Sequence, residues 1–326
     1  MLRFSFSRGH LKLKDAVSRW PGLVSSKWKQ HALQARMASS TPPMKETTFE
    51  PMVNKKPLPN CCSRARPECG DCARYRYMNP ECKVAVITEG ASGLGFDIAN
   101  ELLCNEAYRV ILTGCNWDLG AKALKRLRKK HEEERCCYMK MDPRKESEVK
   151  YVLGRISERF NGIDILVNNA KAINETLWES EVTYNLHSVV QGTLVGMELM
   201  KNTKARPGGI ILNIASTLSF DSDPCLPIFT GTQYAIAGFT KSYGDKKNFA
   251  GSDIRVVGLC PGPLNASHLT CNQGLELAFV SNSSIGKAVI HMIQYAPTGT
   301  LWVLEEGLYR LKFPERKTFQ KKVTYV

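Results

Sequence analysis

Two polar side chains that can bind a carbonyl group lie in a pattern of strand and helix. Ser216 follows an apolar run at 210–214 that predicts a buried strand, and Asn185 lies in an apolar segment at 182–200 that predicts a helix. A hydroxyl and a carboxamide can both orient a carbonyl group, but neither is an obvious general base. A reaction that moves a proton here therefore needs a further group.

Two residues in the first turns of the helix predicted at 229–243 supply no such group. Phe229 stands thirteen residues after Ser216, and Gln233 stands four residues further on. Phenylalanine has no hydroxyl to donate or accept, and the glutamine amide carries no charge. If these four residues, Ser216, Asn185, Phe229 and Gln233, form a catalytic set, as a family resemblance implies, the last two lack proton chemistry.

These spacings resemble those of the short-chain dehydrogenase/reductases, in which a strand-end serine precedes Tyr-x-x-x-Lys by thirteen positions. Phe229 takes the tyrosine position and Gln233 the lysine position. In the family the tyrosine exchanges a proton with the substrate while hydride moves to or from nicotinamide, and the lysine lowers the tyrosine pKa from about 10. Loss of a positioned general acid or base slows a reaction roughly 10²–10⁴-fold. The resemblance thus implies an oxidoreductase ancestry with a degenerate active site.

A glycine-rich turn follows the first predicted strand. Residues 88–95 read TEGASGLG and resemble the family's Thr-Gly-x-x-x-Gly-x-Gly, with Glu89 at the first glycine. Such a turn lets backbone amides approach a pyrophosphate at a helix N-terminus. A carboxylate about 5 Å from the phosphates, at an effective dielectric of about 20, would repel them by about 3 kcal/mol. The sequence predicts weakened binding of NAD or NADP by Thr88, Glu89, Gly90, Ser92, Gly93, Leu94 and Gly95.

The resemblance also implies cofactor positions after the later strands. Gly114 ends the second strand where an aspartate usually binds the adenosine ribose of NAD, and no arginine takes its place to favour NADP. Lys171 replaces the glycine of the family's Asn-Asn-Ala-Gly, and we expect its side chain to be solvated. Ala266 stands where a threonine normally helps to hold the nicotinamide. The other implied cofactor positions are Asp142, Asn169, Pro261, Gly262 and Leu264.

Strands and helices alternate from residue 83 to about residue 312. Strands are predicted at 84–88, 110–113, 138–141, 163–167, 210–214, 254–259 and 301–304. Helices are predicted at 96–104, 119–130, 149–160, 182–200, 229–243 and 285–295. This order predicts an α/β fold, with a single Rossmann-type, doubly wound parallel sheet and helices on both faces.

Short motifs in this domain resemble the 15-hydroxyprostaglandin dehydrogenase-like branch of the family. They include Trp178-Glu179 and Gly238-Phe239-Thr240. Members of that branch oxidise secondary alcohols with NAD. Leu226 replaces a glutamine that those enzymes place near the substrate hydroxyl, so the prostaglandin substrate is not carried over.

Charge is concentrated at the start of this 326-residue chain, whose formal net charge is +14. Residues 1–37 contain eight Lys/Arg against Asp15 alone, without the continuous apolar run of a secretory signal. This composition predicts a mitochondrial transit segment; the alternative is a basic tail on a cytoplasmic protein. No apolar run approaches the roughly 20 residues of a membrane span, and no basic-aromatic motif indicates a nucleic-acid partner.

Residues 38–82 are rich in proline and cysteine and are predicted to form a linker. They contain a Cys-x-x-Cys motif, and four thiolates are enough to hold zinc. The candidate ligands of such a zinc ion are Cys62, Cys69, Cys72 and Cys82. Because the spacing fits no standard zinc module and the stretch lacks histidine, a linker without metal is the preferred interpretation. Residues 313–326 are predicted to form a basic, solvated tail.

Three functions remain open on the sequence. The first is a pseudoenzyme that acts as a scaffold, a partner subunit or a weak nucleotide sensor, favoured by coincident substitutions at Phe229, Gln233, Glu89, Gly114 and Ala266. The second is an NAD(P)-dependent oxidoreductase acting on the CH–OH group of a secondary alcohol, with a water held by Ser216 and Asn185 as proton relay. The third is metal binding in the cysteine-rich segment. A homodimer, or a heterodimer with an active relative, is expected through the helices at 182–200 and 229–243.

Overall fold

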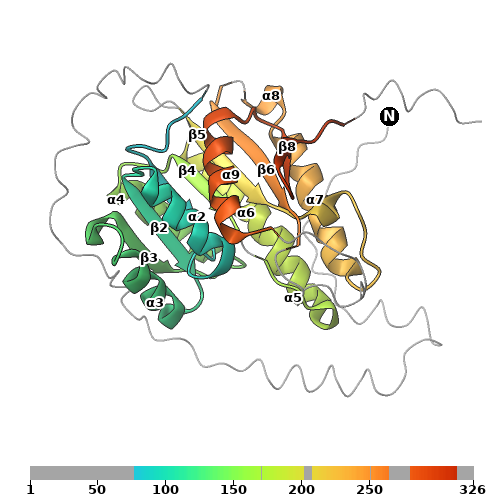
Figure 1. Ribbon diagram of the computed structural model, residues 1–326, viewed down its shortest axis with the longest axis horizontal. Coiled ribbons are helices and arrows are strands. Elements are labelled where there is room, and N and C mark those ends of the chain that lie inside the picture. The colour runs from blue at the N-terminus through green and yellow to red at the C-terminus, as the bar shows by residue number, and fades with distance from the viewer. Residues whose placement is uncertain (1–76, 170, 202–207, 250, 264–279, 314–326) are drawn as a thin grey trace, which may run out of the picture. The chain divides into compact units, whose positions relative to one another are not determined.

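The computed structural model of the protein describes residues 77–169, 171–201, 208–249, 251–263 and 280–313 (Figure 1). The predicted transit segment, most of the linker and residues 314–326 lie outside this part of the chain. The last linker residues lie against the domain, since the Tyr77 amide donates to the Gln294 carbonyl at 3.1 Å. No helix of the described residues is long and apolar enough to cross a membrane.

One sheet of eight strands, ordered β3-β2-β1-β4-β5-β6-β7-β8, forms the centre of the fold. Its strands are β1 (Val84–Ile87), β2 (Arg109–Gly114), β3 (Cys136–Lys140), β4 (Ile165–Asn168), β5 (Gly209–Ile214), β6 (Ile254–Pro261), β7 (Leu301–Leu304) and β8 (Leu308–Arg310). The pairs from β3 to β7 are parallel, as predicted. The structure adds one strand that was not predicted, β8, which runs antiparallel to β7 because the chain reverses at residues 305–307.

Helices cover both faces of the sheet, which confirms the doubly wound architecture. The longer helices are α2 (Gly93–Cys104), α3 (Trp117–Leu127), α4 (Glu146–Arg159), α6 (Ser188–Leu199), α7 (Pro227–Tyr243) and α9 (Asn282–Tyr295). Apolar residues of α2, α3 and α9 pack on one face, and those of α4 and α6 pack on the other. Helices α2 and α9 lie side by side (Figure 1). Because the helices cover the faces of the sheet, a ligand site is expected at the carboxyl ends of its parallel strands.

The helix predicted at 182–200 begins earlier in the structure and contains a π turn. The short helix α5 (Trp178–Val182) continues through the π-helical turn η6 (Thr183–His187) into α6. A π turn accommodates an extra residue within a helix and is often found at functional sites. Here the turn contains Asn185, which is fully buried.

A buried hydrogen-bond network ties the strands of the site to the helices behind them. The Asn213 side chain on β5 accepts from Asn168 Nδ2 at 2.8 Å and donates to Thr240 Oγ1 at 2.9 Å. The Asn168 amide also donates to Thr193 Oγ1 at 3.2 Å. A Cβ added at Gly192 would stand only 2.2 Å from Asn168 Oδ1, so the glycine lets α6 approach β4.

Replacing Asn213 with Leu is expected to destabilise the protein by about 2–3 kcal/mol, because the buried Asn168 amide loses its acceptor and the buried Thr240 hydroxyl loses its donor. Urea denaturation measures the loss. Asn248→Leu, at an exposed position of the short helix α8 (Lys246–Phe249), is the matched control and should change stability by less than about 0.5 kcal/mol. Equal effects of the two substitutions would contradict the role assigned to the network.

Candidate functional site

Ser216 and Asn185 lie beside the carboxyl ends of β5 and β4, and both side chains bind nearby backbone. Ser216 caps the short helix η7 (Thr217–Ser219), and its hydroxyl oxygen accepts from the Leu218 amide at 3.3 Å. Asn185 Oδ1 accepts from the Ala172 amide at 2.7 Å, and Nδ2 donates to the Ala172 carbonyl at 2.8 Å. Asn185 therefore holds the segment that follows β4 in place.

The side chains of Phe229 and Gln233 lie on the same buried face of α7, one turn apart. Phe229 is 5% exposed and Gln233 is completely buried. The Gln233 amide donates to Thr232 Oγ1 at 3.2 Å, and its Oε1 atom finds no hydrogen-bond partner among the described residues. Tyr234 points away from this face and is 47% exposed. It is thus not placed to replace Phe229.

A carboxylate binds the first turn of α7 beside Phe229. Glu175, in the short helix η5 (Glu175–Leu177), accepts from the amides of Ile228 and Phe229, both at 3.0 Å. A negative charge at a helix N-terminus is stabilised by the free amides and by the helix dipole. This contact links the segment after β4 to the helix that carries the catalytic positions.

Lys171 brings a cation into the site, and the expectation of a solvated side chain was wrong. Its ammonium donates a hydrogen bond to the Ala215 carbonyl, next to Ser216, and lies 5.9 Å from the centre of the Phe229 ring. Burial lowers the pKa of Lys171 to about 8, and the neighbouring Cys260 opposes this shift in part. The parallel pairing of β4 with β5 explains the placement, since it puts the end of β4 next to Ala215.

The depressed pKa of Lys171 gives a test by pH. In the unfolded chain the lysine titrates near 10.5, so between pH 8 and 10.5 the unfolded state binds more protons than the folded state. The free energy of unfolding of the unmodified protein, relative to Lys171→Met, is therefore expected to rise across this window. Urea denaturation at pH 7, 8, 9 and 10 measures it, with Lys125→Met on the exposed face of α3 as the charge control. A falling or flat difference would contradict burial of the ammonium.

The glycine-rich turn is held against β4 by Asn169. The Thr88 hydroxyl accepts from the Asn169 amide at 2.9 Å, and the Asn169 side chain donates to the carbonyls of Thr88 and Glu89, each at 3.2 Å. A Cβ at Gly95 would stand 2.7 Å from Asn169 Nδ2, so this close approach needs glycine. Gly93 has a φ of 51°, and a Cβ there would meet no atom within 4 Å.

The remaining residues of the turn complete the start of α2. Gly90 is tied to β2, since its amide donates to the Thr113 carbonyl at 3.0 Å. Ser92 is the N-cap residue of α2, and its carbonyl accepts from the Phe96 amide at 3.3 Å. Leu94 is buried in the first turn of that helix. The amides of this turn, next to the open space beside Gly93, suit a pyrophosphate.

Glu89 adopts a conformation that glycine would adopt more easily, with a φ of 47°. Its side chain lies over the end of β2, where Oε2 would stand 3.1 Å from a Cβ placed at Gly114. Burial raises the pKa of Glu89, and hydrogen bonds from Tyr184 and Cys115 lower it in part. The Oε1 atom is buried and has no hydrogen-bond partner in the described part of the chain.

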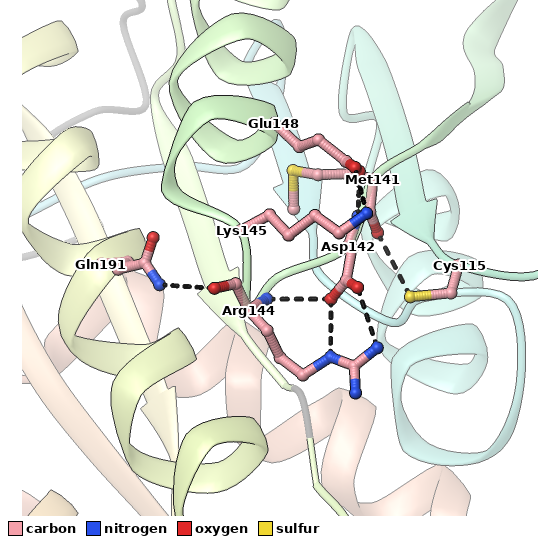
Figure 2. Close-up of polar contacts among 7 residues, drawn as sticks. All are labelled: Cys115, Met141, Asp142, Arg144, Lys145, Glu148 and Gln191. Carbon is pink, nitrogen blue, oxygen red and sulfur yellow. Dashed lines mark hydrogen bonds and ion pairs between the residues drawn. The ribbon is translucent and has the colours of Figure 1, made fainter. Parts of the chain in front are cut away.

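Asp142, one of the implied cofactor positions, is held by Arg144 (Figure 2). The guanidinium donates from Nε to Asp142 Oδ1 at 2.9 Å and from Nη2 to Oδ2 at 2.8 Å. The hydrogen bonds from Arg144 lower the pKa of the Asp142 carboxyl. Gln191 Nε2 donates to the Arg144 carbonyl at 3.2 Å, which fixes this loop against α6. Arg144 was not predicted as a residue of the site, although it stands only two residues after Asp142 in the sequence.

The last implied cofactor positions follow β6. Pro261 ends that strand, and the Gly262 amide donates to the Leu304 carbonyl at 2.8 Å. Leu264 and Ala266 lie outside the described residues, as do the candidate metal ligands Cys62, Cys69 and Cys72. Cys82 is exposed. The described part of the chain contains no group of three or more His, Cys, Asp or Glu side chains that could hold a metal ion.

Comparison with known proteins identifies the family. Residues 83–274 match the profile of the short chain dehydrogenases. The chain belongs to the short chain dehydrogenase family. It is 31% identical to human (Homo sapiens) 15-hydroxyprostaglandin dehydrogenase (NAD(+)) over 192 residues, which span 59% of this chain and 72% of that protein. It is also 28% identical to alcohol dehydrogenase 1 of Ceratitis cosyra over 216 residues, or 66% of this chain and 82% of the relative.

Solved structures of short-chain dehydrogenases share the fold. A structure of actinorhodin polyketide ketoreductase with NADPH superimposes with a TM-score of 0.58 at 23% identity. The match covers 70% of this chain and 97% of the ketoreductase. At this level of identity the likeness supports the Rossmann-type sheet of this short-chain dehydrogenase and no finer statement.

Proposed function

We propose that this short-chain dehydrogenase is a pseudoenzyme, which keeps the fold and the nucleotide turn of an oxidoreductase without its proton relay. The observation that carries the proposal is the buried face of α7, where the Phe229 ring and the Gln233 amide take the two positions of proton transfer. The Lys171 ammonium reaches both the end of β5 and the Phe229 ring, so these groups border one site. Such a protein acts as a scaffold, a partner subunit or a nucleotide sensor.

The nucleotide turn suits a dinucleotide cofactor, NAD or NADP. The open space at Gly93 and the amides at the start of α2 would receive the pyrophosphate, which the helix N-terminus favours. Bound there, the nicotinamide would supply or accept hydride. Ser216 and Asn185 would border the reacting carbon, while Phe229 offers it no proton.

A turnover assay tests the proposal. Purified protein is incubated with NAD or NADP and a series of secondary alcohols, with human 15-hydroxyprostaglandin dehydrogenase as the positive control. We expect rates roughly 10²–10⁴-fold below the control, the usual cost of losing a general acid or base. A turnover number within tenfold of the control for any substrate would refute the proposal.

Lys171 favours one alternative function, an oxidoreductase of secondary alcohols with an altered relay. An amine with a pKa of about 8 is a competent proton acceptor near neutral pH. It lies next to Ser216, whose hydroxyl can orient the substrate. On this alternative, activity would be measurable and would be lost in both Ser216→Ala and Lys171→Met.

Association through the helices of the site is also part of the proposal. Large apolar side chains are exposed on α5, α6 and α7, namely Trp178 at 53%, Leu194 at 45% and Tyr234 at 47%. Such groups favour burial against a second subunit, either another copy or an active relative. Light scattering of the purified protein distinguishes a dimer from a monomer.

We further propose mitochondrial import, directed by the basic segment at 1–37. The support is compositional: eight positive side chains stand against one negative side chain among scattered apolar residues. A fusion of this segment to a fluorescent protein reports the compartment, and diffuse cytoplasmic fluorescence would count against import.

A further inference from the structure

We propose that Glu89 supplies the carboxylate that binds the adenosine ribose, in place of the aspartate that Gly114 has replaced, and that the site consequently selects NAD over NADP. The proposal rests on the retained nucleotide turn of the proposed function. In the family pattern that the sequence resembles, glycine stands at the position of Glu89 and aspartate usually stands at that of Gly114, so the two substitutions amount to one exchange. The carboxylate has moved from the end of β2 to the end of β1.

The position of the Glu89 side chain is the first support. A Cβ built on Gly114 would lie 3.1 Å from Glu89 Oε2 and 3.4 Å from its carboxyl carbon. An aspartate at 114 would therefore direct its carboxylate into the volume that the Glu89 carboxylate already fills. The two carboxylates would crowd and repel each other, so glycine at 114 leaves room for the Glu89 side chain.

The hydrogen bonding of the carboxylate is the second support. Glu89 Oε1 is buried without a hydrogen-bond partner in the described chain, while Tyr184 and Cys115 provide hydrogen bonds to the carboxylate. A buried oxygen without a donor destabilises a fold unless something supplies one. A ribose presents adjacent hydroxyl groups, and a hydroxyl donor suits a carboxylate oxygen.

The backbone of Glu89 is the third support. Its φ of 47° lies in the left-handed region, which a residue with a Cβ adopts at a cost. Strained conformations of this kind persist where the surrounding structure fixes them, often at ligand sites. Here Asn169 donates to the Glu89 carbonyl at 3.2 Å and holds the turn in this conformation.

The charges around Glu89 determine the choice of cofactor. NADP carries a phosphate on the adenosine ribose, and a carboxylate at that position repels it. Arg144 is a cation whose charge acts on Cys115, next to Gly114. Asp142 binds its guanidinium through two hydrogen bonds. The charge of Arg144 is thus largely neutralised, and we expect the Glu89 carboxylate to determine whether a phosphate is repelled.

Calorimetric titration of the full chain with NAD and with NADP tests the proposal. The variants are Glu89→Gln, which keeps the shape and removes the charge, Glu89→Gly, Gly114→Asp, and the exchange Glu89→Gly/Gly114→Asp. We expect the unmodified protein to bind NAD at least tenfold more tightly than NADP. Glu89→Gln and Glu89→Gly should each weaken NAD binding about tenfold, Gly114→Asp should disrupt it, and the exchange should restore it.

Several results would overturn the proposal. Tighter NAD binding by Glu89→Gly than by the unmodified protein would identify Glu89 as an obstruction. Equal affinity for NADP, or the absence of NAD binding at millimolar concentration, would also refute it. The titration measures nucleotide binding in variants that keep Phe229 and Gln233, so its outcome does not depend on catalysis. Dehydrogenase activity in the turnover assay would refute the proposed function without affecting this inference.

Discussion

The variant Phe229→Tyr/Gln233→Lys is expected to oxidise secondary alcohols at least about 10²-fold faster than the unmodified protein. Tyrosine at 229 supplies the hydroxyl that exchanges a proton with the substrate, and lysine at 233 supplies the charge that lowers its pKa. The two positions lie one turn apart on the buried face of α7, so both new side chains point into the same site. Formation of NADH, followed by its absorbance, measures the gain.

The single variants define what each group contributes. Phe229→Tyr alone should gain a measurable part of the rate, because the Lys171 ammonium already lies 5.9 Å from the ring at 229. Gln233→Lys alone should gain nothing, since no hydroxyl is introduced. Adding Ser216→Ala to the double variant should abolish the gain. A double variant that folds, binds nucleotide and remains inactive would show that the site has lost more than its proton relay.

Arg255→Met is expected to destabilise the protein by about 3 kcal/mol or more, the largest effect we predict for a residue outside the site. Arg255 is 4% exposed on β6 and donates to the carbonyls of Met292, Ile293 and Ala296, at 3.3, 2.7 and 2.7 Å. The Met292 carbonyl also accepts from the Ala296 amide at 2.9 Å, but the carbonyls of Ile293 and Ala296 lie at the end of α9, where helical partners are lacking. Losing the guanidinium leaves them buried and unsatisfied. For a domain of this size the melting temperature should fall by roughly 6–12 °C.

Two further substitutions make the Arg255 test specific. Arg255→Lys keeps a positive charge but loses the planar fork, so it should recover only part of the stability. Arg155→Met removes an exposed arginine of α4, whose ion pair with Glu158 is solvated, and should change stability by less than about 0.5 kcal/mol. A melting temperature within 2 °C of the unmodified protein for Arg255→Met would contradict the structural role assigned to this residue.

The sheet could be predicted from the sequence because its strands are apolar runs bounded by turns. The run at 210–214 is the clearest case, and the corresponding strand β5 is completely buried. The π turn η6 could not be predicted, since one extra residue barely alters a helical pattern of period 3.6. Strand β8 was missed because only Leu308 of its three residues is apolar and partly buried, so no alternation was visible.

The positions of the site were predicted more completely than its contacts. The resemblance to the family's serine and Tyr-x-x-x-Lys spacing singled out Ser216, Phe229 and Gln233, and a strand and a helix fix the separation of these residues. Spacing says nothing about where a long side chain ends. Lys171 and Glu89 both belong to turns, and each points toward a neighbouring strand far away in sequence. Their directions depend on the order of the strands, which the sequence pattern does not contain.

The cap that Glu175 places on α7 has a dynamic consequence. Any outward movement of the segment after β4 must break its hydrogen bonds to the amides of Ile228 and Phe229. Hydrogen–deuterium exchange at these two amides should therefore be slow and should accelerate together in Glu175→Gln. The segment after β4 would then stay fastened to the start of α7 even before any ligand arrives.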